Sequence, residues 1–239
     1  MSPPPRMTGS IILLNGTSSA GKSTLANAVQ DVMDAPYLSL GIDHFFEALP
    51  QRYRARLGPD DVPPPQADEG VVWVCTEPSG HGFRELRVGP VGQRLWSGMR
   101  HAAGALARRG NHVILDDVIL DHEALVDYGA ALEGVPTLLV GVTCPLAVLE
   151  AREVARGDRV RGLAAAWLPL VERHAPPYDV TVDTSFSSPE EGALAIKAAA
   201  EQTQWSRAFT QLKETLTGEP RDQTLPAKQF CNRFQEPVS

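Results

Sequence analysis

The chain has 239 residues, of which 43% are hydrophobic and 21% are charged, and its formal net charge at pH 7 is −7. This length and composition suit one large α/β domain with insertions, and the negative charge argues against nucleic acid or an anionic membrane as a partner. No run approaches the roughly 20 apolar residues that span a bilayer, and the N-terminus shows no secretion signal. Three scattered cysteines form no metal or disulfide pattern. We therefore expect a reduced cytoplasmic protein.

Short apolar runs alternate along the chain with segments of helical periodicity. The runs are candidate β-strands, and they occupy residues 11–15, 37–42, 113–115, 138–143 and 179–182. Candidate helices lie at residues 25–33, 93–109, 145–155 and 189–216, the last with Ser187 or Ser188 as its cap. Strands separated by helices form parallel βαβ units with right-handed crossovers. The pattern therefore predicts an α/β fold with a doubly wound parallel sheet.

Residues 51–90 interrupt this alternation. They hold three consecutive prolines at 63–65, and then two strand-like runs, 71–76 and 83–88, on either side of a Pro-Ser-Gly turn. We interpret the second part as a β-hairpin inserted between the second and third core strands. The sequence therefore predicts one domain at 8–204 with an insertion at 51–90, followed by a partly ordered C-terminal extension at 205–239.

Residues 16–23 read Gly-Thr-Ser-Ser-Ala-Gly-Lys-Ser, which matches the phosphate-binding pattern G-x-x-x-x-G-K-[ST] at every specified position. An apolar strand leads into this loop and an amphipathic helix leaves it, an order that a chance Gly-Lys-Ser turn would lack. Glycines let backbone N–H groups fold around phosphate oxygens, and the positive end of the next helix faces the same anion. Lys22 can reach the β- and γ-phosphates, and the Ser23 hydroxyl can bind Mg²⁺. We expect a nucleotide to be bound by Gly16, Thr17, Ser18, Ser19, Ala20, Gly21, Lys22, Ser23 and Thr24.

Two adjacent carboxylates, Asp116 and Asp117, end the third core strand. A carboxylate at this position lies beside the phosphate-binding loop in such folds and holds Mg²⁺ directly or through water. The alternative is a solvated pair or a cap for the following helix. We expect at least one of them to serve the metal, and the sequence does not choose between them.

A further carboxylate, Asp43, comes just after the second core strand. Ligands bind at the carboxyl ends of strands in open α/β sheets, and a kinase that acts on an alcohol needs a group that orients the hydroxyl and accepts its proton. Aspartate is also a common helix N-cap. The local sequence is compatible with both roles.

Four arginines lie within residues 152–161, at the end of a predicted helix: Arg152, Arg156, Arg159 and Arg161. Guanidinium groups match phosphate oxygens and can neutralise charge on a transferring phosphoryl group. A solvated basic face is the alternative, but such a concentration of arginine in an acidic chain favours a lid over the nucleotide, which we place at 151–165.

Taken together, these segments resemble the chloramphenicol phosphotransferase family. The similar stretches are IILLNGTSSAGKS at 11–23, LGIDHFFEALP at 40–50, VILDDVIL at 113–120, EAREVARGDRV at 150–160 and YDVTVDT at 178–184. The resemblance covers residues 8–200. It implies a P-loop kinase core with strand order 2-3-1-4-5, ATP as the phosphoryl donor, Asp43 as the base for the acceptor alcohol, and Arg156 and Arg159 as ligands of the nucleotide phosphates. Residues 51–90 and the C-terminal extension depart from the family pattern, so the acceptor is left open.

These observations predict an ATP- and Mg²⁺-dependent phosphotransferase that acts on a hydroxyl of a small molecule, with chloramphenicol as one candidate and a role in antibiotic modification. Lys22, Asp43, Arg156 and Arg159 are the expected catalytic residues, Ser23, Asp116 and Asp117 the candidate metal ligands, and Arg152 a further nucleotide ligand. Another acceptor, such as a nucleotide-sugar or a metabolite, is an alternative. A nucleotide-binding regulator is a third hypothesis, against which the intact set of reactive residues argues. The oligomeric state, a homo-oligomer included, is left open.

Overall fold

The central sheet forms from the five predicted apolar runs. In the computed structural model, which describes residues 8–78, 82–156, 160–202, 205 and 208–212, these runs are β1 (Ile11–Asn15), β2 (Tyr37–Gly41), β6 (His112–Asp117), β7 (Thr137–Thr143) and β8 (Val180–Asp183). They pair in parallel in the order β2-β6-β1-β7-β8, which confirms the order 2-3-1-4-5 when the core strands alone are numbered. β1 and β7 are buried at every residue except Thr143, as parallel strands covered on both faces should be.

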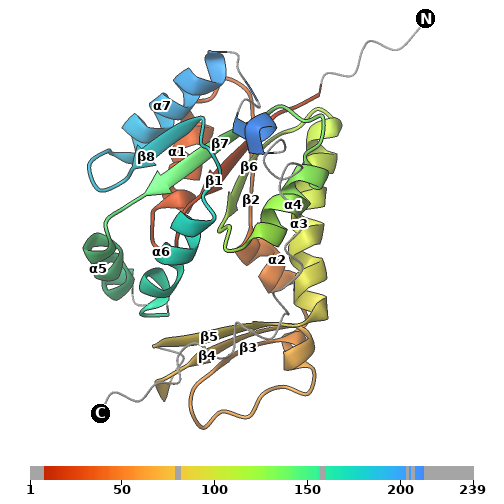
Figure 1. Cartoon of the computed structure of the whole chain (residues 1–239), viewed down its shortest axis with the longest axis vertical. Helices are drawn as coiled ribbons and strands as arrows, with labels where there is room; N and C mark the ends of the chain where they lie inside the picture. The colour runs from red at the N-terminus through yellow and green to blue at the C-terminus, as the bar shows by residue number, and fades with distance from the viewer. Residues whose placement is uncertain (1–7, 79–81, 157–159, 203–204, 206–207, 213–239) are drawn as a thin grey trace, which may run out of the picture.

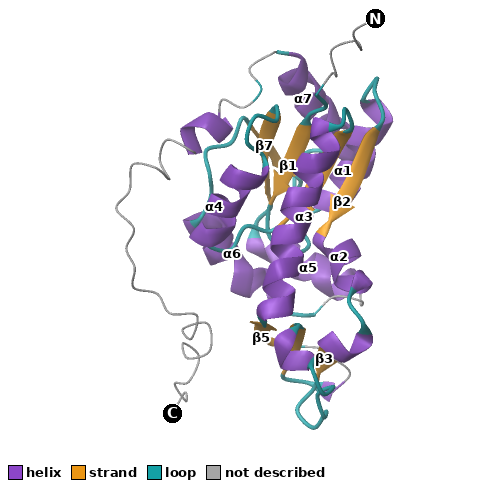
Figure 2. Ribbon diagram, turned by 90° about the vertical axis from the view of Figure 1, so that its right-hand side faces the viewer, coloured by secondary structure: helices purple, strands orange, loops and turns teal. Residues whose placement is uncertain are grey.

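Helices cover both faces of this sheet (Figures 1 and 2). One core contains α1 (Lys22–Val32) and α7 (Pro189–Glu201), and the other contains α3 (Pro90–Arg108) and α4 (His122–Ala131). Successive β1 side chains enter the two cores in turn, Ile12 and Leu14 the first and Ile11 and Leu13 the second. This alternation explains why the first four residues of β1 are all apolar.

The remaining core helices lie beyond the carboxyl end of the sheet, where β7 leads into α5 (Leu146–Arg156) and α6 (Leu163–Arg173) (Figure 1). They occupy most of the predicted lid at 151–165, and Arg159 of that lid lies outside the described residues.

The C-terminal helix α7 begins as the sequence predicts. Ser188 accepts a hydrogen bond from the backbone N–H of Glu191, and the Glu191 side chain returns a bond to Ser188, which forms a capping box. The helix ends at Glu201, earlier than predicted. Helical residues resume at 208–212, where Ala208, Phe209 and Leu212 are buried in the α3–α4 core. The start of the extension therefore packs on the domain, and residues 213–239 lie outside the described part.

The insertion folds into a small sheet of its own. β4 (Val71–Cys75) and β5 (Phe83–Val88) form the predicted antiparallel hairpin. A third strand, β3 (Arg54–Leu57), pairs in parallel with β4; its sequence, Arg-Ala-Arg-Leu, lacks the β-branched and aromatic residues that mark strands, and we did not predict it. Short helices of the described residues flank these strands, namely α2 (Ile42–Ala48), η1 (Gln51–Tyr53) and η2 (Ala67–Glu69).

Aromatic side chains join the small sheet to α6, the helix that begins in the predicted lid. The Trp73 and Trp167 ring centroids are 5.6 Å apart, and Phe83 lies 6.2 Å from Trp167 and 6.3 Å from Trp73. The Phe83 backbone N–H also donates to the Arg161 carbonyl at 2.6 Å. The small sheet is therefore held beneath the carboxyl end of the main sheet, next to α6 (Figure 1).

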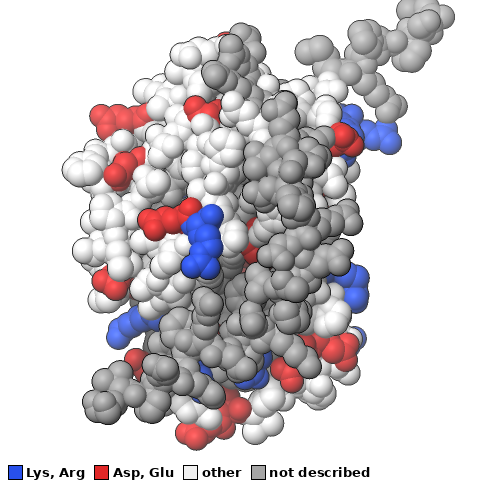
Figure 3. All heavy atoms as spheres, in the orientation of Figure 1, with Lys and Arg blue, Asp and Glu red and all other residues white. Residues whose placement is uncertain are grey.

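The surface carries both signs of charge. Figure 3 shows acidic and basic side chains interspersed over the described part of the face it presents. Among the described residues, no helix is long and apolar enough to cross a membrane.

Candidate active site

The phosphate-binding loop connects β1 to α1, and its backbone takes conformations that few side chains tolerate. Gly21 is the N-cap of α1 with φ +90°, and Ser19 has φ +60°. A Cβ on Gly16 would collide with the Val142 carbonyl oxygen, so β7 leaves no room for a larger residue there. Left-handed residues between right-handed ones turn successive N–H groups to one side, which makes an anion-binding concavity.

Two side chains of this loop are buried in a way that suits a bound phosphate. Lys22 is only 8% exposed; its ammonium donates to the Thr17 carbonyl at 3.1 Å and lies 3.6 Å from Asp116 Oδ1. The Ser19 hydroxyl is buried and has no hydrogen-bond partner in the described chain. A buried hydroxyl without a partner is costly unless a ligand supplies one. The loop therefore has the features of an anion-binding site.

Asp116 lies beside the start of α1. Its Oδ2 accepts a hydrogen bond of 2.7 Å from the Ser23 hydroxyl. A serine hydroxyl and a carboxylate are hard oxygen donors of the kind that Mg²⁺ prefers, and Mg²⁺ commonly takes its remaining ligands from phosphates and water. The described residues contain no cluster of three or more His, Cys, Asp or Glu side chains that could hold a metal alone. The donor set thus fits a metal that arrives with a nucleotide.

The structure does not bring Asp117 to the phosphate-binding loop. Adjacent residues of a strand point to opposite faces, and Asp117 is buried on the α3–α4 side. It accepts from the Tyr128 hydroxyl at 2.6 Å and the Val118 N–H at 2.8 Å, and lies 3.7 Å from Arg100 Nε. Burial raises the pKa of Asp117, and the Arg100 guanidinium opposes that shift. The two carboxylates therefore serve different places, and Asp116 is the one next to Ser23.

Asp43 is the second residue of α2, and the N-cap of that helix is Gly41. The capping role that the sequence left open for Asp43 thus falls to another residue. Gly41 pairs with Asp116 in the β2–β6 register, so Asp43 lies in the first turn of α2, just beyond the position of Asp116. The side chain is exposed at the carboxyl end of the sheet, where ligands bind in such folds.

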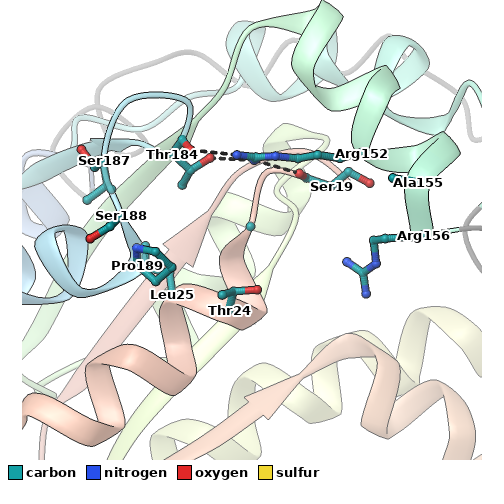
Figure 4. A pocket seen from close by; sticks show the side chains of 12 residues that line it. Ser19, Thr24, Leu25, Arg152, Ala155, Arg156, Thr184, Ser187, Ser188 and Pro189 are labelled. Carbon is teal, nitrogen blue, oxygen red and sulfur yellow. Dashed lines mark hydrogen bonds between the residues drawn. The ribbon is translucent and has the colours of Figure 1, made fainter.

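The arginines of α5 differ in what they contact. Arg152 donates to the Thr184 hydroxyl at 2.9 Å and the Thr184 carbonyl at 2.7 Å, and reaches the Ser19 carbonyl at 3.4 Å. The Thr184 hydroxyl in turn donates to the Ala20 carbonyl at 2.8 Å. Arg152 thus ties α5 and the end of β8 to the phosphate-binding loop. Arg156, one turn further along, is directed into the adjoining cavity (Figure 4).

That cavity has a volume of about 320 Å³, in the range of small-ligand pockets. Its walls come from the phosphate-binding loop and α1, from α5, and from the segment between β8 and α7; the lining residues are Ser19, Gly21, Thr24, Leu25, Arg152, Ala155, Arg156, Val182, Thr184, Ser187, Ser188 and Pro189. Sequence analysis missed the wall at Thr184 and Ser187–Pro189, although its place after a core strand was a usable signal.

Comparison with known families shows which family the chain belongs to. The chloramphenicol phosphotransferase-like protein family matches residues 9–201. The chain belongs to this family. A Mycobacterium tuberculosis protein named "Putative O-phosphotransferase" is 33% identical to it over 210 residues, covering 86% of this chain and 88% of that protein, in both strain CDC 1551 and strain H37Rv. The resemblance found in the sequence is thereby confirmed.

Solved structures of other proteins share the fold of this chain. The Mycobacterium tuberculosis APS kinase CysC, solved with AMPPNP and APS, superposes with a TM-score of 0.55 at 17% identity, covering 81% of this chain and 98% of that one. A sugar kinase from Janibacter gives a TM-score of 0.52 at 16% identity, over 82% and 96% of the two chains. At these identities the likeness concerns the fold, which is that of P-loop kinases.

Proposed function

We propose that the protein transfers the γ-phosphoryl group of ATP, with Mg²⁺, to a hydroxyl group on a small molecule. The observation that carries this proposal is the placement of Lys22, Ser23 and Asp116 around one phosphate-binding loop, with Asp43 beyond the neighbouring strand end. Phosphoryl transfer needs positioning and charge stabilisation more than covalent chemistry, and these residues supply both.

The nucleotide would span the loop and the adjoining cavity. Its phosphates would accept from the loop N–H groups and from Lys22, and its ribose and base would enter between α5 and Ser187–Pro189. Arg156 is directed into this space, where a guanidinium can bind phosphate oxygens. Arg152 would act by holding the loop and the β8 end together, because its donors already bind Thr184 and Ser19.

Ser23 and Asp116 would hold the metal. When bound, Mg²⁺ would neutralise part of the negative charge of the nucleotide phosphates. Lys22 now lies 3.6 Å from Asp116, so its ammonium is already in the loop and needs only to turn towards a phosphate.

In the transfer step, the acceptor oxygen forms a bond to the γ-phosphorus while the bond from that phosphorus to the β,γ-bridging oxygen breaks. The bridging oxygen leaves on ADP with the electron pair. The hydroxyl proton passes to the Asp43 carboxylate and then to solvent. Lys22 and Arg156 stabilise the negative charge spread over the transferring oxygens.

The acceptor is proposed from the family alone. The family description names chloramphenicol, which makes this alcohol the first acceptor to try and antibiotic modification a proposed role. We place the acceptor beside the small sheet, which follows α2 along the chain and lies beyond the carboxyl end of the main sheet (Figure 1).

The test is a screen of alcohols, chloramphenicol included, with ATP, Mg²⁺ and the purified full chain, followed by mass spectrometry. We expect one alcohol to gain a single phosphoryl group, and its yield to fall to background when ATP or Mg²⁺ is omitted. Two results would contradict the proposal. One is phosphorylation that persists without added ATP, and the other is ATP hydrolysis with no phosphorylated product from any alcohol.

A further inference from the structure

One side of the small sheet carries arginines towards the kinase core. In the strand register Arg54 pairs with Val71 and Arg56 with Trp73, while Val88 and Leu86 continue the same rows on β5. Paired residues project to the same face, so these six side chains share one side, which we call the core-facing side.

Contacts show that this side is turned to the core. A Cβ added to Gly92 of α3 would lie 2.8 Å from Val71 Cγ2, so Val71 packs directly on that helix. The Trp73 ring contacts Trp167 of α6. The core-facing side therefore looks towards the helices that surround the carboxyl end of the main sheet.

The charges on the two sides differ. Two of the six core-facing side chains are cationic and none is acidic. On the opposite side, Glu85 and Arg87 form an ion pair with each other, at 3.2 Å between Oε1 and Nε. The small sheet thus carries only positive charge on its core-facing side and an ion pair of opposite charges on the other side.

Arg54 is the arginine whose surroundings are best defined. Its guanidinium carbon lies 5.6 Å from the centre of the Phe46 ring, and Nη1 is 3.5 Å from the Phe46 carbonyl. The described residues place no carboxylate in an ion pair with Arg54. An aromatic ring covers one flat face of a guanidinium and leaves the N–H donors along its edge available to a ligand.

Arg54 also lies close to the proposed base. Phe46 and Asp43 are three residues apart on α2, and residues at this spacing neighbour one another on a helix surface. A ligand whose hydroxyl meets Asp43 would therefore extend towards Arg54.

We propose that the acceptor carries an anionic group, a carboxylate or a phosphate, and that Arg54 binds it. A guanidinium fork matches both groups. The inference rests on the proposed function and adds the chemical class of the acceptor. It separates this chain from a kinase for uncharged alcohols, since chloramphenicol has no anionic group.

The experiment compares anionic acceptors with related uncharged alcohols. Transfer from ATP is measured for glycerate, gluconate and glycerol phosphate, for their uncharged partners glycerol and glucose, and for chloramphenicol. Binding of the same anions is measured by calorimetry with AMPPNP and Mg²⁺ saturating the nucleotide site. The full chain is compared with Arg54→Gln, Arg54→Lys and the control Arg87→Gln, which alters the opposite side of the sheet.

We expect an anionic compound to bind and to have at least a tenfold higher kcat/KM than its uncharged partner. Arg54→Gln should raise its Kd and KM about ten- to a hundredfold, with the KM for ATP unchanged; Arg54→Lys should fall between, and Arg87→Gln should match the wild type. If the role of Arg54 is only structural, through its hydrogen bond to the Phe46 carbonyl in α2, Arg54→Gln lowers Tm and leaves the preference for anionic acceptors intact.

Three outcomes overturn the inference: no anion binds, anions bind equally well to Arg54→Gln, or chloramphenicol has a higher kcat/KM than every anionic compound. The last of these leaves the proposed kinase function standing. Conversely, anion binding that depends on Arg54 without transfer to any alcohol supports the site and overturns the proposed function.

Discussion

A buried carboxylate joins the two helices of the lid region. Glu153 of α5 is 2% exposed and accepts hydrogen bonds from the backbone N–H groups of Gly162 at 2.9 Å and Ala164 at 2.7 Å. Gly162 is the N-cap of α6 and has no side chain to cap it. Glu153 therefore caps α6 from a neighbouring helix, and its negative charge faces the positive end of that helix.

Removing this carboxylate should destabilise the protein measurably. Hydrogen bonds to a charged group contribute about 1.5–3 kcal/mol each, and water will replace part of both at a helix end. We expect Glu153→Ala to lower the free energy of unfolding by about 3 kcal/mol, which for a chain of this size lowers Tm by about 6–12 °C. Glu153→Gln should cost about half as much, because its amide oxygen still accepts a hydrogen bond but without charge.

The assay is urea and thermal denaturation of the wild type and both variants. Glu150→Ala, an exposed position on the same helix, is the control and should stay within about 0.5 kcal/mol of the wild type. The KM for ATP should rise in Glu153→Ala, since α5 carries Arg152 and Arg156. A Glu153→Ala protein as stable as the Glu150→Ala control would refute the capping role.

Three further predictions concern the reacting residues. Lys22→Ala should abolish transfer with Tm nearly unchanged, and turnover near the wild-type rate would rule out the nucleotide assignment. Asp43→Asn should lower kcat at least about tenfold with ATP affinity retained; because Gly41 caps α2, a variant that is destabilised yet fully active would contradict the catalytic role. Asp116→Asn should raise the Mg²⁺ concentration needed for half-maximal rate, whereas Asp117→Asn should lower Tm and leave that concentration unchanged, and the reverse pattern would exchange the two roles.

The sequence was sufficient for the features that depend on local pattern. The phosphate-binding loop, the five core strands and the Ser188 cap each combine a residue type with a short-range geometry, and all are present. Strand order came from the family resemblance, because which strands neighbour one another is decided by contacts far apart in sequence.

Other features depend on packing that no local pattern records. Alternation along β6 places Asp116 and Asp117 on opposite faces, but only the packing of Tyr128 and Arg100 decides which aspartate is buried. Likewise, the sequence predicted Arg152 as a nucleotide ligand. Its contacts with Thr184 depend on the position of β8 beside the loop, which no local pattern indicates. The sequence did not predict β3 because its strand conformation depends on pairing with β4 and not on its own residues.

The central claim is that ATP consumption and alcohol phosphorylation are one reaction. The direct measurement follows ADP and phosphorylated alcohol in the same sample by phosphorus NMR, for the wild type and for Lys22→Ala. We predict that the two products appear in equal amounts with the wild type and that both disappear with Lys22→Ala. ADP formed without phosphorylated alcohol, at a rate that Lys22→Ala does not change, would contradict the account.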